Sequence, residues 1–185
     1  PKQLGHLVLR VRDLDGCEQF YTEVLGLRVT NKRLGKMVFM SSGSAASHEL
    51  ALVPVGPEAP GPDDGRVGLY HFAWEMSSFE DLKQLYQEMK RKGVRIGGIG
   101  DHGISIGVYF FDPDGNEIEA FYELPAEYWP SKGDLFTASS DFEIVDMIIA
   151  NSHEAITAMV VQEFTLSDAY PNPFNPSTTV ELMIP

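Results

Sequence analysis

The chain has 185 residues, of which 43% are hydrophobic and 22% charged, an ordinary composition for a soluble globular protein with a sizeable core. Its 27 Asp and Glu against 14 Lys and Arg give a net charge of −13, which repels phosphate backbones, so we expect no nucleic-acid partner. The longest apolar runs are far shorter than a membrane span, so we expect no membrane insertion.

The first recognisable unit is GHLVLRVRDLDGCEQFYTEVLGLRV, residues 5–29, which reads as an apolar strand followed by a helix. Asp13 is a typical N-cap, the apolar residues then recur at helical spacing, and Gly26 suits the left-handed residue that ends a helix. Cys17, the one cysteine, falls on the apolar face of this helix, where we expect a buried structural thiol. Three short strands are expected to follow, at residues 28–33, 37–42 and 48–54.

Residues 70–96, YHFAWEMSSFEDLKQLYQEMKRKGVRI, repeat this unit and align His71 with His6. Ser77 with Glu80 forms a capping box that should open the second helix. Three strands are again expected, at residues 94–99, 104–111 and 116–122, the last two joined by the Asp-Pro-Asp-Gly turn at 112–115. The fold class predicted is therefore α+β, with two βαβββ modules.

The domain boundaries follow from this repeat and from a linker rich in Pro and Gly. We expect one domain over residues 1–130, made of module one at 3–54, the linker at 55–67 and module two at 68–125. A C-terminal extension is expected at residues 131–168.

The last segment, AYPNPFNPSTTVELMIP at residues 169–185, resembles the opening of a type IX secretion sorting domain. An exported enzyme cut short, a fusion or gene-boundary artefact, and a coincidental turn-rich tail all fit this pattern. The part of the chain before this tail resembles cytoplasmic proteins, which implies a cytoplasmic location, and export is expected only if the tail is a genuine sorting signal.

A carboxylate inside an apolar strand needs an explanation. In YFFDPDGNEIEAF, residues 109–121, Glu117 and Glu119 share one face of a predicted strand. Burying a carboxylate costs several kcal/mol unless a charge, strong hydrogen bonds or a metal compensates it. If the modules are related by an approximate two-fold axis, Glu119 converges with His6 and His71. Two histidines and one carboxylate suit a divalent iron or manganese site.

The segments GHLVLRVRDLDGCEQFYTEVLGLRV and YFFDPDGNEIEAFYE resemble the vicinal oxygen chelate superfamily. This superfamily includes glyoxalase I, extradiol ring-cleaving dioxygenases, fosfomycin-resistance thiol transferases and bleomycin-resistance proteins. The resemblance covers about residues 3–130 and implies that His6, His71 and Glu119 are the metal ligands. It also implies a possible homodimer, because related proteins often pair their modules across two chains.

The stretch SHELALV, residues 47–53, bears on the subclass. On a strand only one of the neighbours His48 and Glu49 can point inward. An inward Glu49 would give four ligands, as in glyoxalase-like isomerases, whereas an inward His48 would leave three ligands and an acid/base. HELAL resembles extradiol dioxygenases, in which this histidine assists oxygen activation. Tyr109 resembles their substrate-binding tyrosine, and His102 resembles their second active-site histidine.

The resemblance thus implies an Fe(II)-dependent extradiol dioxygenase that opens an aromatic diol with O2, with Mn(II), Zn(II) or Ni(II) as alternative metals. A glyoxalase I-like isomerase or a thiol transferase using the same metal site is the alternative function. A metal-free binding protein like the bleomycin-resistance proteins is the second alternative. Four aromatic residues are candidates for a pocket wall or for ordinary core: Phe39, Phe72, Trp74 and Phe111.

Overall fold

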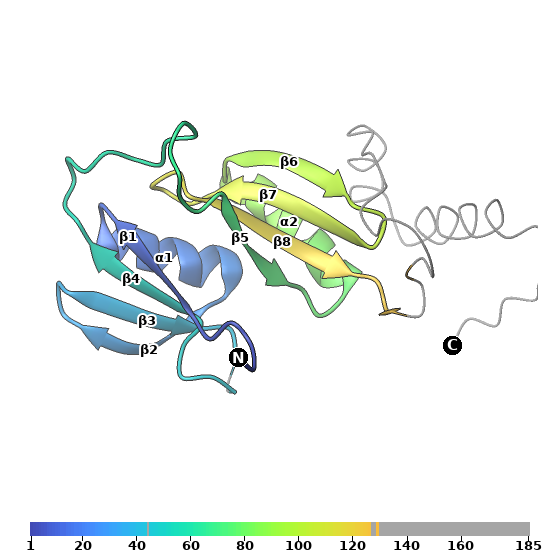
Figure 1. The fold of residues 1–185 in the computed structure, drawn as a ribbon, viewed down its shortest axis with the longest axis horizontal. Helices are drawn as coiled ribbons and strands as arrows, with labels where there is room; N and C mark the ends of the chain where they lie inside the picture. Colours follow the sequence, from blue (N-terminus) through green and yellow to red (C-terminus); the bar gives the residue numbers. More distant parts are fainter. Residues whose placement is uncertain (44, 127–128, 130–185) are drawn as a thin grey trace, which may run out of the picture. The chain divides into compact units, whose positions relative to one another are not determined.

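The computed structural model describes residues 1–43, 45–126 and 129, all within the first of two compact units, residues 1–150 (Figure 1). In this part of the chain no helix is long and apolar enough to cross a membrane. The expected C-terminal extension and sorting-like tail lie outside the described residues.

The first module is a four-stranded mixed sheet with one helix (Figure 1). Its strand order is β1-β4-β3-β2, with β1 parallel to β4 and the other pairs antiparallel. The elements are β1 (Leu7–Val11), α1 (Leu14–Leu25), β2 (Arg28–Arg33), β3 (Met37–Ser41) and β4 (Leu50–Pro54).

The second module repeats this arrangement, with strand order β5-β8-β7-β6 and β5 parallel to β8. Its elements are β5 (His71–Glu75), α2 (Phe79–Lys92), β6 (Ile96–Asp101), β7 (Ser105–Phe111) and β8 (Glu117–Glu123). The predicted α+β fold of two βαβββ modules is confirmed.

The helix caps agree with the sequence in one module and differ by one residue in the other. Asp13 caps α1 by accepting hydrogen bonds from two backbone N–H groups, as predicted, and Gly26 ends it in the left-handed conformation with φ 68°. The prediction of Ser77 and Glu80 as the capping box of α2 is wrong. Ser78 is the cap, and its hydroxyl accepts from the Asp81 N–H at 3.1 Å. Two successive serines carry the same signal, so composition alone does not choose between them.

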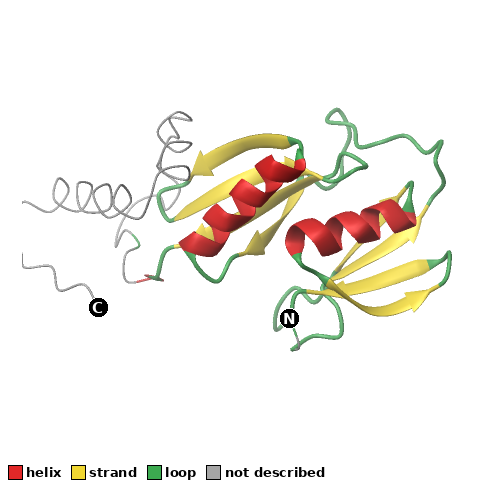
Figure 2. Ribbon diagram, turned by 180° about the vertical axis from the view of Figure 1, so that it is seen from behind, coloured by secondary structure: helices red, strands yellow, loops and turns green. Residues whose placement is uncertain are grey.

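Each sheet has one face covered by its own helix and one helix-distal face (Figure 2). In β1, Leu9 and Val11 are buried against the helix side, whereas Val8 and Arg10 are exposed on the other side. In β8, Ile118 lies in the core, so the neighbouring Glu119 belongs to the helix-distal face. The predicted site residues that lie in strands therefore belong to faces that neither α1 nor α2 covers.

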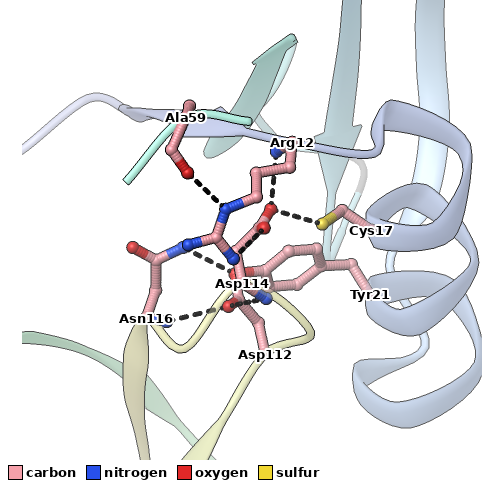
Figure 3. A network of polar contacts seen from close by, with 7 residues as sticks. All are labelled: Arg12, Cys17, Tyr21, Ala59, Asp112, Asp114 and Asn116. Carbon is pink, nitrogen blue, oxygen red and sulfur yellow. Dashed lines mark hydrogen bonds and ion pairs between the residues drawn. The ribbon is translucent and has the colours of Figure 1, made fainter. Parts of the chain in front are cut away.

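The Asp-Pro-Asp-Gly turn between β7 and β8 joins the two modules through a buried carboxylate (Figure 3). Asp112 is only 5% exposed and accepts a hydrogen bond of 2.9 Å from the Tyr21 hydroxyl of α1. It also accepts hydrogen bonds from the Asn116 side chain and from the backbone N–H groups of Asp114 and Asn116. Burial and the Asp112 carboxylate both raise the pKa of the Tyr21 phenol, so Tyr21 stays a neutral donor.

Asp114, in the same turn, forms the second intermodule contact (Figure 3). It accepts hydrogen bonds from the Arg12 backbone N–H at 2.8 Å and from the Arg12 guanidinium at 3.2 Å. The Cys17 thiol donates to the same carboxylate at 3.3 Å. Burial and this hydrogen bond raise the pKa of Cys17, which confirms the predicted buried thiol and keeps it protonated. The turn is thus held by α1 and by Arg12, which directly follows β1.

We predict that Tyr21→Phe lowers the free energy of unfolding by about 1.5–3 kcal/mol, because it removes a hydrogen bond to a buried carboxylate. Urea unfolding at neutral pH measures this change. The matched control is Tyr122→Phe, since Tyr122 is half-buried and its hydroxyl makes no hydrogen bond with the described residues. Equal effects of the two substitutions would contradict the assignment.

The Tyr21 contribution should also depend on pH. Its folded-state pKa lies above the unfolded value of about 10, so its contribution is complete below that pH and is lost as the pH rises. The difference between wild type and Tyr21→Phe should therefore narrow in alkaline solution.

Candidate functional site

His71 and Glu119 meet on the helix-distal face of the second sheet. His71 is the first residue of β5, and the parallel register places it opposite Glu117 of β8, with Glu119 two residues further along the same face. The His71 Nε2 lies 3.4 Å from the Glu119 Oε2. Glu119 is only 8% exposed, so its carboxylate has lost most of its water and gained an imidazole neighbour.

Gly107 provides the space that the Glu119 side chain occupies. It lies on β7, which pairs with β8, and a Cβ atom at this position would collide with the Glu119 carboxylate. The backbone of β7 therefore passes close under the carboxylate, as a strand glycine allows. Sequence reasoning did not single out this residue. The available signal was a glycine inside the apolar run SIGVYFF.

Tyr109 and His102 extend this group. Tyr109 faces Glu119 across the β7–β8 pair, and its ring lies edge-on to the His71 ring at 5.5 Å between centroids. Tyr109 Oη and His102 Nε2 share a hydrogen bond of 2.7 Å, and this nitrogen lies 4.0 Å from the Glu119 Oε1. Burial and the Glu119 carboxylate raise the pKa of the Tyr109 phenol, so it remains protonated. We call His71, His102, Tyr109 and Glu119 the module-two cluster.

His6 and His48 form a second group, on module one. The two rings lie 4.6 Å apart, and the Phe39 ring meets His48 edge-on at 5.1 Å. His6 directly precedes β1, while the pairing of β1 with β4 brings His48 beside it. We call His6 and His48 the module-one pair.

The side chains of His48 and Glu49 have different partners in the structure. β4 is assigned from Leu50, two residues later than expected, but the Glu49 N–H already bonds the Met40 carbonyl and the Glu49 carbonyl accepts from the Leu7 N–H. The His48 ring lies against His6, and its Nδ1 shares a hydrogen bond of 3.0 Å with the Ser47 hydroxyl. Glu49 instead accepts a hydrogen bond of 3.3 Å from the Ser42 backbone N–H.

The donor set of the module-two cluster fits part of a divalent-metal site. Metal–ligand distances of about 2.0–2.2 Å place neighbouring donor atoms on one ion roughly 3.0–3.5 Å apart, which matches the His71–Glu119 separation of 3.4 Å. The other nitrogen of His71, Nδ1, is buried without a hydrogen-bond partner among the described residues. Imidazole and carboxylate are also ligands that divalent iron accepts.

The three expected ligands are not gathered in one place. Among residues 1–43, 45–126 and 129, no three His, Cys, Asp or Glu side chains form a group that could hold a metal, so His6 does not join His71 and Glu119. The ligand set of His6, His71 and Glu119 stays a prediction.

The four candidate aromatic residues separate into different environments. Phe72 and Trp74 pack against the hydrophobic core. Phe111 is stacked by the Arg95 guanidinium at 3.7 Å from the ring centroid. Only Phe39 of these four contacts a predicted catalytic histidine, His48.

Comparison with known proteins places this geometry in a family. Residues 3–120 match the profile of the Glyoxalase/Bleomycin resistance protein/Dioxygenase superfamily. The chain belongs to this superfamily.

Two curated relatives and one solved structure show its range. A catechol-2,3-dioxygenase of Bacillus subtilis (strain 168) is 32% identical over 127 residues, which are 68% of this chain and 43% of the relative. A biphenyl-2,3-diol 1,2-dioxygenase 3 of Rhodococcus globerulus is 32% identical over 118 residues, 63% of this chain and 61% of the relative. The chain thus spans less than two thirds of either relative. The crystal structure of a lactoylglutathione lyase from Agrobacterium tumefaciens matches with a TM-score of 0.53 and 26% identity, covering 66% of this chain and 94% of that one.

We predict that Gly107→Ala displaces the Glu119 carboxylate and lowers the free energy of unfolding by about 1–3 kcal/mol, the usual cost of overpacking. Urea unfolding measures the loss. Gly68→Ala is the control, because a Cβ at Gly68 meets nothing within 4 Å, and it should change stability by less than about 1 kcal/mol. If the two alanines were equally well tolerated, the close packing of Glu119 on β7 would be refuted.

Proposed function

We propose that the protein is an extradiol dioxygenase, which opens the ring of a catechol-type diol with O2. The observation that carries this proposal is the position of His48, whose ring lies against His6 while Glu49 is bonded elsewhere. This arrangement supplies an acid/base beside a predicted metal ligand, without a second carboxylate ligand. The similarity to a catechol-2,3-dioxygenase and a biphenyl-2,3-diol 1,2-dioxygenase supports the same branch.

His71 and Glu119 would hold the metal, with His6 as the third ligand. Ferrous iron bound by these groups would supply one centre at which a vicinal diol and O2 are held together. Mn(II), Zn(II) and Ni(II) accept similar ligands and are the alternative metals. Gly107 keeps the Glu119 carboxylate in place by leaving room for it.

The proposed catalytic residues manage protons and hydrogen bonds around the diol. His48 is half-buried, and as a neutral imidazole it can accept a proton or stabilise negative charge that develops on the oxygen. Tyr109, kept protonated by burial and by Glu119, can donate a hydrogen bond to a substrate oxygen. His102 orients the Tyr109 hydroxyl through their 2.7 Å hydrogen bond.

We further propose that the functional unit is a homodimer. Among the described residues, neither the module-one pair nor the module-two cluster makes up a three-ligand metal site within one chain. In a two-fold symmetric dimer, His6 of one copy can meet His71 and Glu119 of the other, and the symmetry then produces two equal sites. Both sites would then lie at the same two-fold interface between the copies.

Anaerobic reconstitution with Fe(II), followed by substituted catechols in air, tests the proposed function. We expect a yellow ring-opened product together with one O2 consumed per product molecule. If a metal-loaded protein takes up no O2, the dioxygenase proposal is wrong and the isomerase or transferase alternatives gain support. If the protein binds no metal, the metal-free binding protein is favoured.

We predict that His48→Ala retains Fe(II) but lowers kcat by about 10²- to 10⁴-fold, as expected for loss of an acid/base group. Anaerobic metal titration and steady-state O2 uptake measure the two properties separately. Glu49→Ala is the matched control, because its carboxylate bonds the Ser42 N–H, and it should retain both metal and turnover. Loss of metal from Glu49→Ala would instead support a four-ligand isomerase site.

A further inference from the structure

A hollow of about 480 Å³ opens beside His48 on module one. This volume suits a single substituted aromatic ring. Phe39 lies in the wall of the hollow and contributes an apolar ring surface, and its ring also touches His48 edge-on. The lining residues used below are Arg28, Arg33, Phe39 and His48.

A bulge in β2 places Arg33 on this face. Arg28 pairs with Ser41 of β3, but the register shifts between Val29 and Asn31. After the shift, Lys32 points to the helix side, where it forms ion pairs with Asp15 and Glu18. The next residue, Arg33, therefore points to the helix-distal face, as Arg28 does. Without the bulge, Lys32 rather than Arg33 would share the face of Arg28.

The hollow is positively charged in a chain whose net charge is −13. Its described lining includes two arginines and no Asp or Glu, whereas four other hollows of the described residues are each lined by one or more carboxylates. The Arg33 side chain makes no hydrogen bond or ion pair with the described residues. Arg28 donates only to the Gly43 carbonyl, which leaves its charge uncompensated.

We infer that the substrate diol carries a carboxylate, which Arg33 binds. Arginine binds carboxylates in a planar, two-pronged geometry, and a charge-assisted hydrogen bond is stronger than a neutral one. The ring of this substrate packs against Phe39, and its diol points toward His48 and His6. The inference rests on the proposed function, because His48 links the hollow to the predicted metal ligands.

The test compares 3,4-dihydroxyphenylacetate with its methyl ester, which has the same diol and ring but no charge. Both are assayed with the Fe(II)-loaded protein, and both are titrated anaerobically to obtain dissociation constants. The variants are Arg33→Gln and, as the control on the same strand, Lys32→Gln, whose side chain points to the other face. The readout is the ratio of the two kcat/KM values and the ratio of the two dissociation constants.

We expect wild type and Lys32→Gln to prefer the acid, and Arg33→Gln to reduce that preference about 10- to 100-fold. Added salt should weaken binding of the acid more than binding of the ester. Equal use of acid and ester by wild type, or an unchanged ratio in Arg33→Gln, would overturn the inference while leaving the dioxygenase proposal intact. Preferential anaerobic binding of the acid without any ring opening would support the inference and reject the proposed reaction.

Discussion

The Asp-Pro-Asp-Gly turn of module two docks on α1 and on Arg12 of module one, and this contact connects the two modules. Two carboxylates, Asp112 and Asp114, accept hydrogen bonds from Tyr21, Arg12 and Cys17 of the other module (Figure 3). Because these groups are largely removed from water, losing one partner leaves another unsatisfied, which is costly. The turn also connects the strands that carry Tyr109 and Glu119, so the same contacts set the position of the module-two cluster.

The nearly buried Glu119 is a second constraint on the structure of the module-two cluster. Its carboxylate is tolerated because Gly107 leaves room for it and because His71 and His102 lie within 4.0 Å. These neighbours place histidine nitrogens around a carboxylate in a region of low water content, where electrostatic interactions are strong. A metal cation bound there would compensate the buried charge of the carboxylate.

The sequence predicted the elements well because each module repeats the same periodicities. The strands, the helices and the caps Asp13 and Gly26 all follow from local patterns. It failed where neighbouring residues carry the same signal, as with Ser77 and Ser78, and where the expected strand included two polar residues that precede the apolar run, as at Leu50. These are differences of one or two residues, and local propensity does not resolve them.

The site was predictable in part. The pairing of His71 with Glu119 follows from the repeat and from period-two alternation, whereas the role of Gly107 depends on which strand runs under the carboxylate. The bulge in β2 decides to which face of the sheet Arg33 points, and no residue pattern in β2 predicts this bulge. Whether His6 joins His71 and Glu119 depends on long-range packing that local sequence patterns do not encode, and among the described residues the three form no metal-binding group.

In the proposed homodimer, His6 and the module-two cluster are halves of one metal site that a second copy completes. Refolding an equal mixture of the inactive variants His6→Ala and His71→Ala tests it most directly. Half of the dimers would be mixed, and each mixed dimer would have one intact site out of two. We therefore predict recovery of about a quarter of the wild-type O2 uptake and metal content. If a mixture shown to exchange chains recovers no activity, the two copies do not share a metal site.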